Sequence, residues 1–159
     1  MVPSMQVLLV DDHEDNLFAL ESALAPLGYP IAASTSGVTA LKTALRGAIA
    51  VAILDVVMPE VKGLDVVRYL ARLEQTRLIP VILVTGMSQN THLAAQALQL
   101  GVAALMVKPV GPWALRIKVQ YLYRTSHLLH TVPTQRQEPA RHPDEPTPDE
   151  RGHRDTGQR

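Results

Sequence analysis

Asp55 stands at the end of an uninterrupted apolar run, Ala50 to Leu54, and Met58-Pro59 follows shortly after it. Such a run predicts a strand buried on both faces, as in a parallel sheet. Proline stops the strand because it fixes φ and has no N–H to donate to a ladder. We therefore expect Asp55 where a buried strand reaches a loop. An ionised carboxylate there is costly unless it is paired, hydrogen-bonded or bound to a metal.

Three further predicted strands also end in residues able to do chemistry. Residues 5–10 end at Asp11-Asp12, residues 80–84 at Thr85, and residues 103–107 at Lys108. Parallel strands end at one edge of a sheet, and sites in open α/β sheets form outside that edge. We therefore expect carboxylates, a hydroxyl and an ammonium group to meet there.

Carboxylates gathered in this way repel one another and raise at least one pKa unless a cation intervenes. Mg²⁺ is suited to the site, because it prefers one or two carboxylates, water and phosphate oxygens. Asp55 then becomes a candidate nucleophile for phosphoryl transfer. The metal and Lys108 would neutralise charge on the phosphoryl oxygens, and Thr85 could donate a hydrogen bond to one of them.

Each of these residues also has a purely structural interpretation. Asp12 could be only the N-cap of the next helix, and Thr85-Gly86 only a turn. Lys108 could be a solvated surface charge and Asp55 an ordinary loop aspartate. The six histidines show no spacing typical of metal ligands. The functional interpretation is favoured because independent structural roles would not place all these residues at the same edge.

Helical patterns separate the strands, so strand and helix alternate five times and the fold class is α/β. Each connection has room for a crossover helix, which predicts a doubly wound, five-stranded parallel sheet with helices on both faces. The expected strands are 5–10, 31–34, 50–55, 80–84 and 103–107. The expected helices are 14–27, 38–46, 62–73, 92–100 and 112–129.

Composition narrows the function classes. Fifteen basic residues balance fifteen acidic ones, so there is no electrostatic footprint for nucleic acid or an anionic membrane. No apolar run approaches the ~18 residues of a membrane helix, and cysteine is absent. We expect a cytoplasmic protein. Residues 131–159 are rich in proline and charge, which predicts a disordered tail without an output domain after the folded domain at 5–127.

These motifs resemble the receiver domain of response regulators in two-component, phosphorelay signal transduction, the CheY-like fold. The resemblance covers roughly residues 5 to 125 and rests on Asp11-Asp12, Asp55 with Met58-Pro59, Gly63, Thr85-Gly86 and Lys108-Pro109. It implies a flavodoxin-like strand order of 2-1-3-4-5. It also implies a protein that is not a turnover enzyme on an external substrate, although it assists its own phosphorylation and dephosphorylation.

The resemblance implies a role for each matching residue. Asp55 would accept a phosphoryl group from a sensor histidine kinase or a histidine phosphotransfer protein. Thr85 and Lys108 would contact that group, and the peptide bond before Pro109 would be cis. The ligands of Mg²⁺ would be Asp11, Asp12, Asp55 and the backbone carbonyl of Val57.

The chain departs from the family pattern at Leu105, where the family usually carries an aromatic switch residue. The last predicted helix also has apolar residues on more than one face. We expect signalling through this helix, as a homodimer or with a downstream protein partner, although a wide core-facing stripe would give the same pattern. The candidate interface residues are Trp113, Ile117, Tyr121 and Leu122.

Three other functions remain open. A scaffold with a vestigial site would bind partners without phosphorylation, and Leu105 is the reason to consider it. A haloacid dehalogenase-like phosphatase also uses Asp, Thr and Lys with Mg²⁺, but it needs an acid two residues after its nucleophile, where this chain has Val57. A flavodoxin-like flavin protein would need a phosphate-cradling loop after the first strand, which we do not find.

Overall fold

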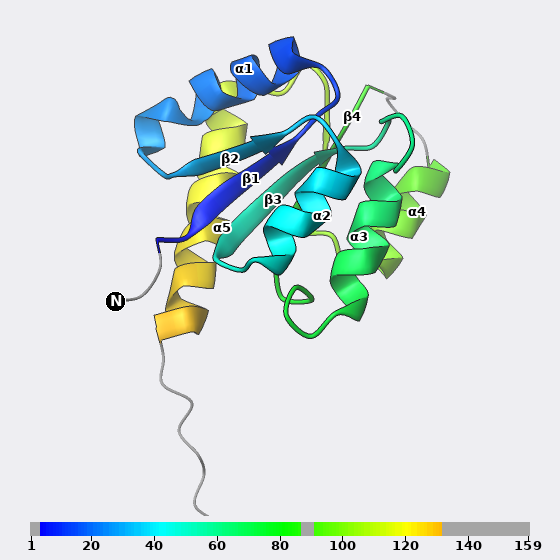
Figure 1. The fold of residues 1–159 in the computed structure, drawn as a ribbon. Coiled ribbons are helices and arrows are strands. Elements are labelled where there is room, and N and C mark those ends of the chain that lie inside the picture. The colour runs from blue at the N-terminus through cyan, green and yellow to red at the C-terminus, as the bar shows by residue number, and fades with distance from the viewer. Residues whose placement is uncertain (1–3, 87–90, 132–159) are drawn as a thin grey trace, which may run out of the picture.

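Five parallel strands form one sheet in the order β2-β1-β3-β4-β5 in the computed structural model, which describes residues 4–86 and 91–131 (Figure 1). The predicted fold class and strand order are confirmed. The strand bounds are β1 Gln6–Val10, β2 Ile31–Ser34, β3 Ile49–Asp55, β4 Val81–Thr85 and β5 Ala104–Val107.

Helices cover both faces of the sheet, as the alternation of strands and helices predicted (Figure 1). Helices α1 (Glu14–Leu24) and α5 (Pro112–Thr131) pack on one face, and α2 (Gly37–Leu45), α3 (Gly63–Arg72) and α4 (Thr91–Gln99) pack on the other. Each helix turns an apolar stripe towards the strands, which is the periodicity that the sequence shows.

The two layers bury β3 completely, because this strand lies in the middle of the sheet. All seven of its residues are buried. Ile53 packs with the core residues under α1 and α5, whereas Leu54 packs with those under α2, α3 and α4. A strand held by apolar contacts on both faces has little freedom to move, so it fixes the position of Asp55 at its end.

Helix α1 ends earlier than predicted. The sequence pattern suggested a helix to Leu27, but the α-helix stops at Leu24 and continues as a short 3₁₀ turn over Ala25–Leu27. Pro26 explains the change, because it has no N–H to continue the α-helical hydrogen bonds. Gly28 closes the turn with φ +70°, a left-handed conformation that glycine adopts without strain.

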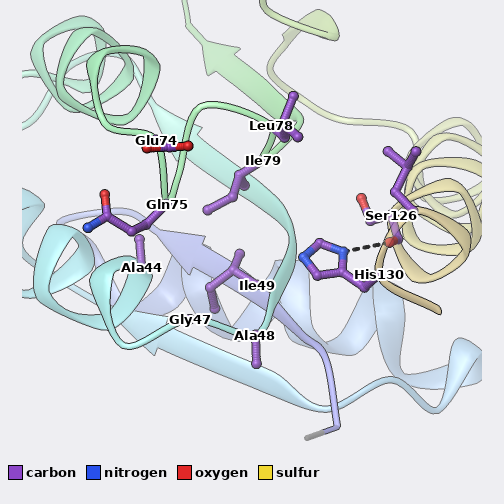
Figure 2. A pocket seen from close by; sticks show the side chains of 11 residues that line it. Ala44, Gly47, Ala48, Ile49, Glu74, Gln75, Leu78, Ile79, Ser126 and His130 are labelled. Atoms are coloured by element: carbon purple, nitrogen blue, oxygen red, sulfur yellow. Dashed lines mark hydrogen bonds between the residues drawn. The ribbon is translucent and has the colours of Figure 1, made fainter. Parts of the chain in front are cut away.

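Helix α5 is anchored along the sheet by buried side chains and one buried hydrogen bond. Leu115 and Val119 are buried, and Ser126 Oγ donates to the carbonyl oxygen of Ala50 at 2.6 Å. Near its end, Ser126 and His130 line a cavity of about 190 Å³ together with Ile49 (Figure 2). Ile49 begins β3, so this cavity lies at the end of the strand opposite to Asp55.

Within residues 4–86 and 91–131, no helix combines the length and hydrophobicity that crossing a membrane requires. The predicted tail lies almost wholly in residues 132–159, outside the described residues. The domain limits of 5–127 and the nature of the tail therefore stay predictions.

Candidate functional site

Asp11 and Asp55 lie side by side at the carboxyl edge of the sheet. Asp55 is the last residue of β3, and Asp11 follows β1, in which Val10 pairs with Leu54. Both carboxylates are buried. Lys108 follows β5, and its Nζ atom lies 3.4 Å from Asp11 Oδ2 and 3.3 Å from Asp55 Oδ2. The predicted meeting of strand ends is confirmed for these three side chains.

The charges at this edge shift one another's pKa. Burial, and then the neighbouring Asp11 carboxylate, raises the pKa of Asp55, while Lys108 and the N–H of Val57 oppose the shift. Burial acts to lower the pKa of the Lys108 ammonium, but the attraction of Asp11 and Asp55 outweighs it and the pKa is raised. Lys108 therefore stays charged, and two crowded carboxylates depend on it for compensation.

Further hydrogen bonds hold the two carboxylates in place. The N–H of His13 donates to Asp11 Oδ1 at 2.9 Å, and Asn16 Nδ2 donates to the same oxygen at 3.2 Å. The N–H of Val57 donates to Asp55 Oδ1 at 3.3 Å. Sequence reasoning missed Asn16. Its position in the first turn of α1, just beyond the aspartate pair, is the signal that could have found it.

The alternative role of Asp12 as a helix N-cap is wrong. The N-cap of α1 is His13, one residue later, and no side chain caps that end of the helix. Asp12 Oδ1 instead lies 3.0 Å from His13 Nδ1. One ligand atom each from Asp11, Asp12 and His13 lie within 4.8 Å of one another. The spacing of the histidines does not reveal this cluster, because only one of its members is a histidine.

Thr85 and Lys108 come from the last two strands of the sheet. Thr85 is buried at the end of β4, and its carbonyl oxygen accepts a hydrogen bond from the N–H of Lys108 at 2.8 Å. The Lys108–Pro109 peptide bond is cis, as the resemblance implied. Leu105 pairs with Leu83 across β4 and β5 and is 36% exposed. The position of the missing aromatic residue therefore lies at the open edge of the sheet.

The start of α3 is pressed against the backbone of Asp55. The N–H of Gly63 donates to the carbonyl oxygen of Val56 at 3.2 Å. A Cβ atom on Gly63 would lie 2.2 Å from the carbonyl oxygen of Asp55, so only glycine fits this approach. Val57, in the loop between β3 and α3, is exposed. The loop after Asp55 is thus short of space on its α3 side and open to solvent at Val57.

The donor set at this edge fits a hard divalent cation. Asp11, Asp12 and Asp55 offer carboxylate oxygens, which Mg²⁺ prefers. Burial, and then the neighbouring Asp11 carboxylate, raises the pKa of Asp55, and a divalent cation would favour its charged form. A cavity of about 550 Å³ adjoins the site, with Asp11, Asn16 and Lys108 at its polar end and Leu20 and Leu115 among its apolar lining. The cavity therefore gives a group brought by a partner access to Asp11 and Lys108.

The four predicted interface residues on α5 differ in how far they are exposed. Trp113, Ile117 and Tyr121 are 74%, 68% and 67% exposed, so they do not belong to a wide core-facing stripe. Leu122 is only partly exposed and packs against the core under α1 and α5. It lies about 100° around the helix from Tyr121, which turns it towards the sheet.

Residues 7–120 match the sequence model of the response regulator receiver domain. Response regulator PleD of Caulobacter vibrioides is 35% identical over 121 residues, which is 76% of this chain and 26% of PleD. Response regulator SaeR of Staphylococcus aureus is 32% identical over 129 residues, which is 81% of this chain and 55% of SaeR. The chain thus spans between a quarter and about half of the length of these two curated relatives.

Solved structures show the same fold. Chemotaxis protein CheY4 of Vibrio cholerae aligns with a TM-score of 0.69 and 25% identity, covering 75% of this chain and 98% of that one. The receiver domain of a putative LuxO repressor from Vibrio parahaemolyticus aligns with a TM-score of 0.73 and 23% identity, covering 80% of this chain and 95% of that one.

Proposed function

The chain belongs to the family of response regulator receiver domains, and from this premise we propose that it is a phosphorylation-activated receiver with Asp55 as phosphoacceptor. The observation that carries the proposal is Lys108, whose ammonium group contacts both Asp11 and Asp55 at the ends of β1 and β3. A cation placed against an acceptor carboxylate also suits the negative charge that a phosphoryl group brings.

In the proposed reaction, a carboxylate oxygen of Asp55 attacks the phosphorus of a phosphohistidine on a sensor kinase or phosphotransfer protein. The P–N bond breaks as the P–O bond forms, and the histidine nitrogen leaves with the electron pair. Mg²⁺, held by Asp11, Asp12, Asp55 and the carbonyl of Val57, would neutralise charge on the phosphoryl oxygens. Lys108 and Thr85 would contact these oxygens from the other strands.

The donor would approach through the cavity between α1 and the start of α5. This cavity has a polar end at Asp11 and Lys108 and an apolar wall that includes Leu20 and Leu115. A histidine side chain on a partner helix could enter there beside Asp11 and Lys108, whose Nζ atom lies 3.3 Å from Asp55 Oδ2, while apolar neighbours fill the rest of the space.

Output would pass through α5. Trp113, Ile117 and Tyr121 follow one another at intervals of four residues and are all exposed, which makes one apolar stripe on the helix. We propose that a second copy or a downstream protein covers this stripe after phosphorylation. In size-exclusion chromatography, Ile117→Ser with Tyr121→Ser should abolish any size shift on phosphorylation. Phe18→Ser, a change of another exposed apolar side chain on α1, should leave the shift intact.

Val57 leads to a proposal about the lifetime of the phosphoryl group. It is an exposed apolar residue two positions after Asp55, where a polar side chain could orient a hydrolytic water. Met87, the apolar residue two positions after Thr85, lies outside the described residues. We expect a long-lived phosphoryl group, and loss of the label within seconds without a phosphatase would contradict this.

Phosphorylation by acetyl phosphate tests the proposed function. Intact-mass measurement should show a gain of one phosphoryl group that requires Mg²⁺ and disappears in Asp55→Asn. Asp15→Asn is the matched control, because Asp15 is an exposed aspartate in the first turn of α1. Equal labelling of Asp55→Asn and the wild type would refute the proposal.

A scaffold that works without phosphorylation is the second candidate, because Leu105 replaces the usual aromatic residue and lies at the edge of the sheet. Such a protein would bind its partner equally well before and after phosphorylation. Membership of the receiver family argues against the phosphatase and flavin-protein alternatives.

A further inference from the structure

His13 brings an imidazole to the aspartate pair. Its Nδ1 atom lies 3.0 Å from Asp12 Oδ1 and 3.6 Å from Asp11 Oδ1. The backbone contributes to this placement, because the N–H of His13 also donates to Asp11 Oδ1 at 2.9 Å. The ring is thus held over the carboxylates by its own main chain, from the N-cap position of α1.

The separation of these atoms suits a shared metal ion. Two ligand atoms that are each about 2.1 Å from an ion and at right angles to one another lie about 3.0 Å apart. Asp12 Oδ1 and His13 Nδ1 have this separation, and Asp11 Oδ1 is close enough to complete one face of the ion's shell or to bind through water. Asp12 and His13 could therefore bind an ion with little change in the distance between Oδ1 and Nδ1.

Metal binding through Nδ1 leaves the other ring nitrogen of His13, Nε2, with a hydrogen-bond partner. The imidazole would carry its proton on Nε2, and the His13 side chain is 69% exposed, so that N–H can donate to water. A metal would replace the contact between Nδ1 and Asp12, which in its absence is a hydrogen bond. Exchanging this hydrogen bond for a bond between Nδ1 and a metal therefore costs little.

We propose that His13 is a fourth side-chain ligand of the metal pocket, beside Asp11, Asp12 and Asp55, and shifts its preference from Mg²⁺ towards divalent transition metals such as Co²⁺. The proposal rests on the proposed function, since it concerns the metal of the same site. Mg²⁺ favours oxygen ligands, whereas imidazole binds Co²⁺ and later metals more strongly. Asp11, Asp12 and Asp55 alone would provide only oxygen. The imidazole nitrogen of His13 would make the pocket selective among metals, while Asp55 remains the phosphoacceptor.

Calorimetric titrations of the whole chain with Mg²⁺ and with Co²⁺ test this proposal. His13→Ala should weaken Co²⁺ binding at least about tenfold and leave Mg²⁺ binding unchanged. His92→Ala, which removes an exposed histidine on α4, is the matched control and should change neither. Pulsed electron paramagnetic resonance of bound Mn²⁺ gives a second readout, because a coordinated imidazole nitrogen modulates the signal. That modulation should be present in the wild type and absent in His13→Ala.

Two results would overturn the proposal. Unchanged Co²⁺ affinity in His13→Ala would show that the imidazole is not a ligand. An equal loss of Mg²⁺ and Co²⁺ affinity would show that His13 only positions Asp12 through its hydrogen bond. Failure of the proposed function is seen separately, as absence of acetyl phosphate labelling in the wild type with saturating Mg²⁺. The metal titrations remain informative in that case.

Discussion

The close approach of Gly63 to the backbone of Asp55 makes Gly63→Ala a sensitive test of how the site is built. A Cβ atom there would lie 2.2 Å from the carbonyl oxygen of Asp55, 3.0 Å from its carbonyl carbon and 3.0 Å from the Cα of Val56. Ordinary contacts between carbon and a carbonyl oxygen are about 3.3 Å or longer. Backbone atoms of β3 or α3 must therefore move by roughly 1 Å.

The cost can be estimated from these contacts. Overpacking a well-packed region costs about 1–3 kcal/mol, and the upper end applies because the obstructing atoms are all backbone. Replacing glycine by alanine also restricts the unfolded chain, which returns about 0.4–1 kcal/mol. The net loss in the free energy of unfolding should be about 2 kcal/mol. With a slope of about 2 kcal/mol per molar urea, the unfolding midpoint falls by about 1 M.

Urea unfolding followed by circular dichroism measures this loss, and Gly86→Ala is the matched control. Gly86 follows Thr85 at the same edge of the sheet, and a Cβ atom there would meet nothing within 4 Å. The urea midpoint of Gly86→Ala should stay close to that of the wild type. Gly63→Ala should lower the midpoint and should also slow labelling of Asp55 by acetyl phosphate. Equal midpoints for the two variants would refute the close packing of α3 against Asp55.

Two further predictions concern ionised groups. Lys108→Met removes the cation between Asp11 and Asp55. In EDTA, the free energy of unfolding should therefore fall by about 1–2 kcal/mol. This value is below that for a fully buried ion pair, because Lys108 is 32% exposed and solvent screens its charge. Saturating Mg²⁺ should restore part of the loss, and a urea midpoint equal to that of the wild type in EDTA would contradict the pairing. Burial, and then Tyr29, raises the pKa of Tyr123, whose hydroxyl donates to the carbonyl of Met5. The folded state therefore holds this proton more tightly, and the stabilisation is complete below pH 10 and lost as pH rises through the raised pKa. Between pH 9 and pH 11, the free energy of unfolding should fall more for the wild type than for Tyr123→Phe. Equal falls for the two proteins would contradict the raised pKa of Tyr123.

The sequence predicts the sheet and the position of the site well, because both depend on patterns of several residues. Each strand is an apolar run that ends at a polar residue or a turn, and parallel strands leave one arrangement for their ends. The meeting of Asp11, Asp55 and Lys108 follows from that rule alone. Their distances confirm it, although these residues are far apart in the chain.

Two points that the sequence pattern did not resolve each depend on a single residue of register. Asp12 and His13 compete for the N-cap of α1, and the backbone conformation of one residue decides between them. Tyr121 and Leu122 differ by about 100° on α5, so the rotation of the helix decides which one faces solvent. The contact of Asn16 with Asp11 and the approach of the His13 ring to Asp11 depend on side-chain rotamers, which no sequence pattern specifies.

Locating the phosphoryl group tests the central claim most directly. The wild-type protein would be labelled with acetyl phosphate and Mg²⁺, and borohydride would then reduce the acyl phosphate so that tandem mass spectrometry can identify the modified residue. The account predicts that Asp55, between the ammonium of Lys108 and the N–H of Val57, carries the modification. Modification at Asp11 or Asp12 instead, or at no aspartate under saturating Mg²⁺, would contradict it.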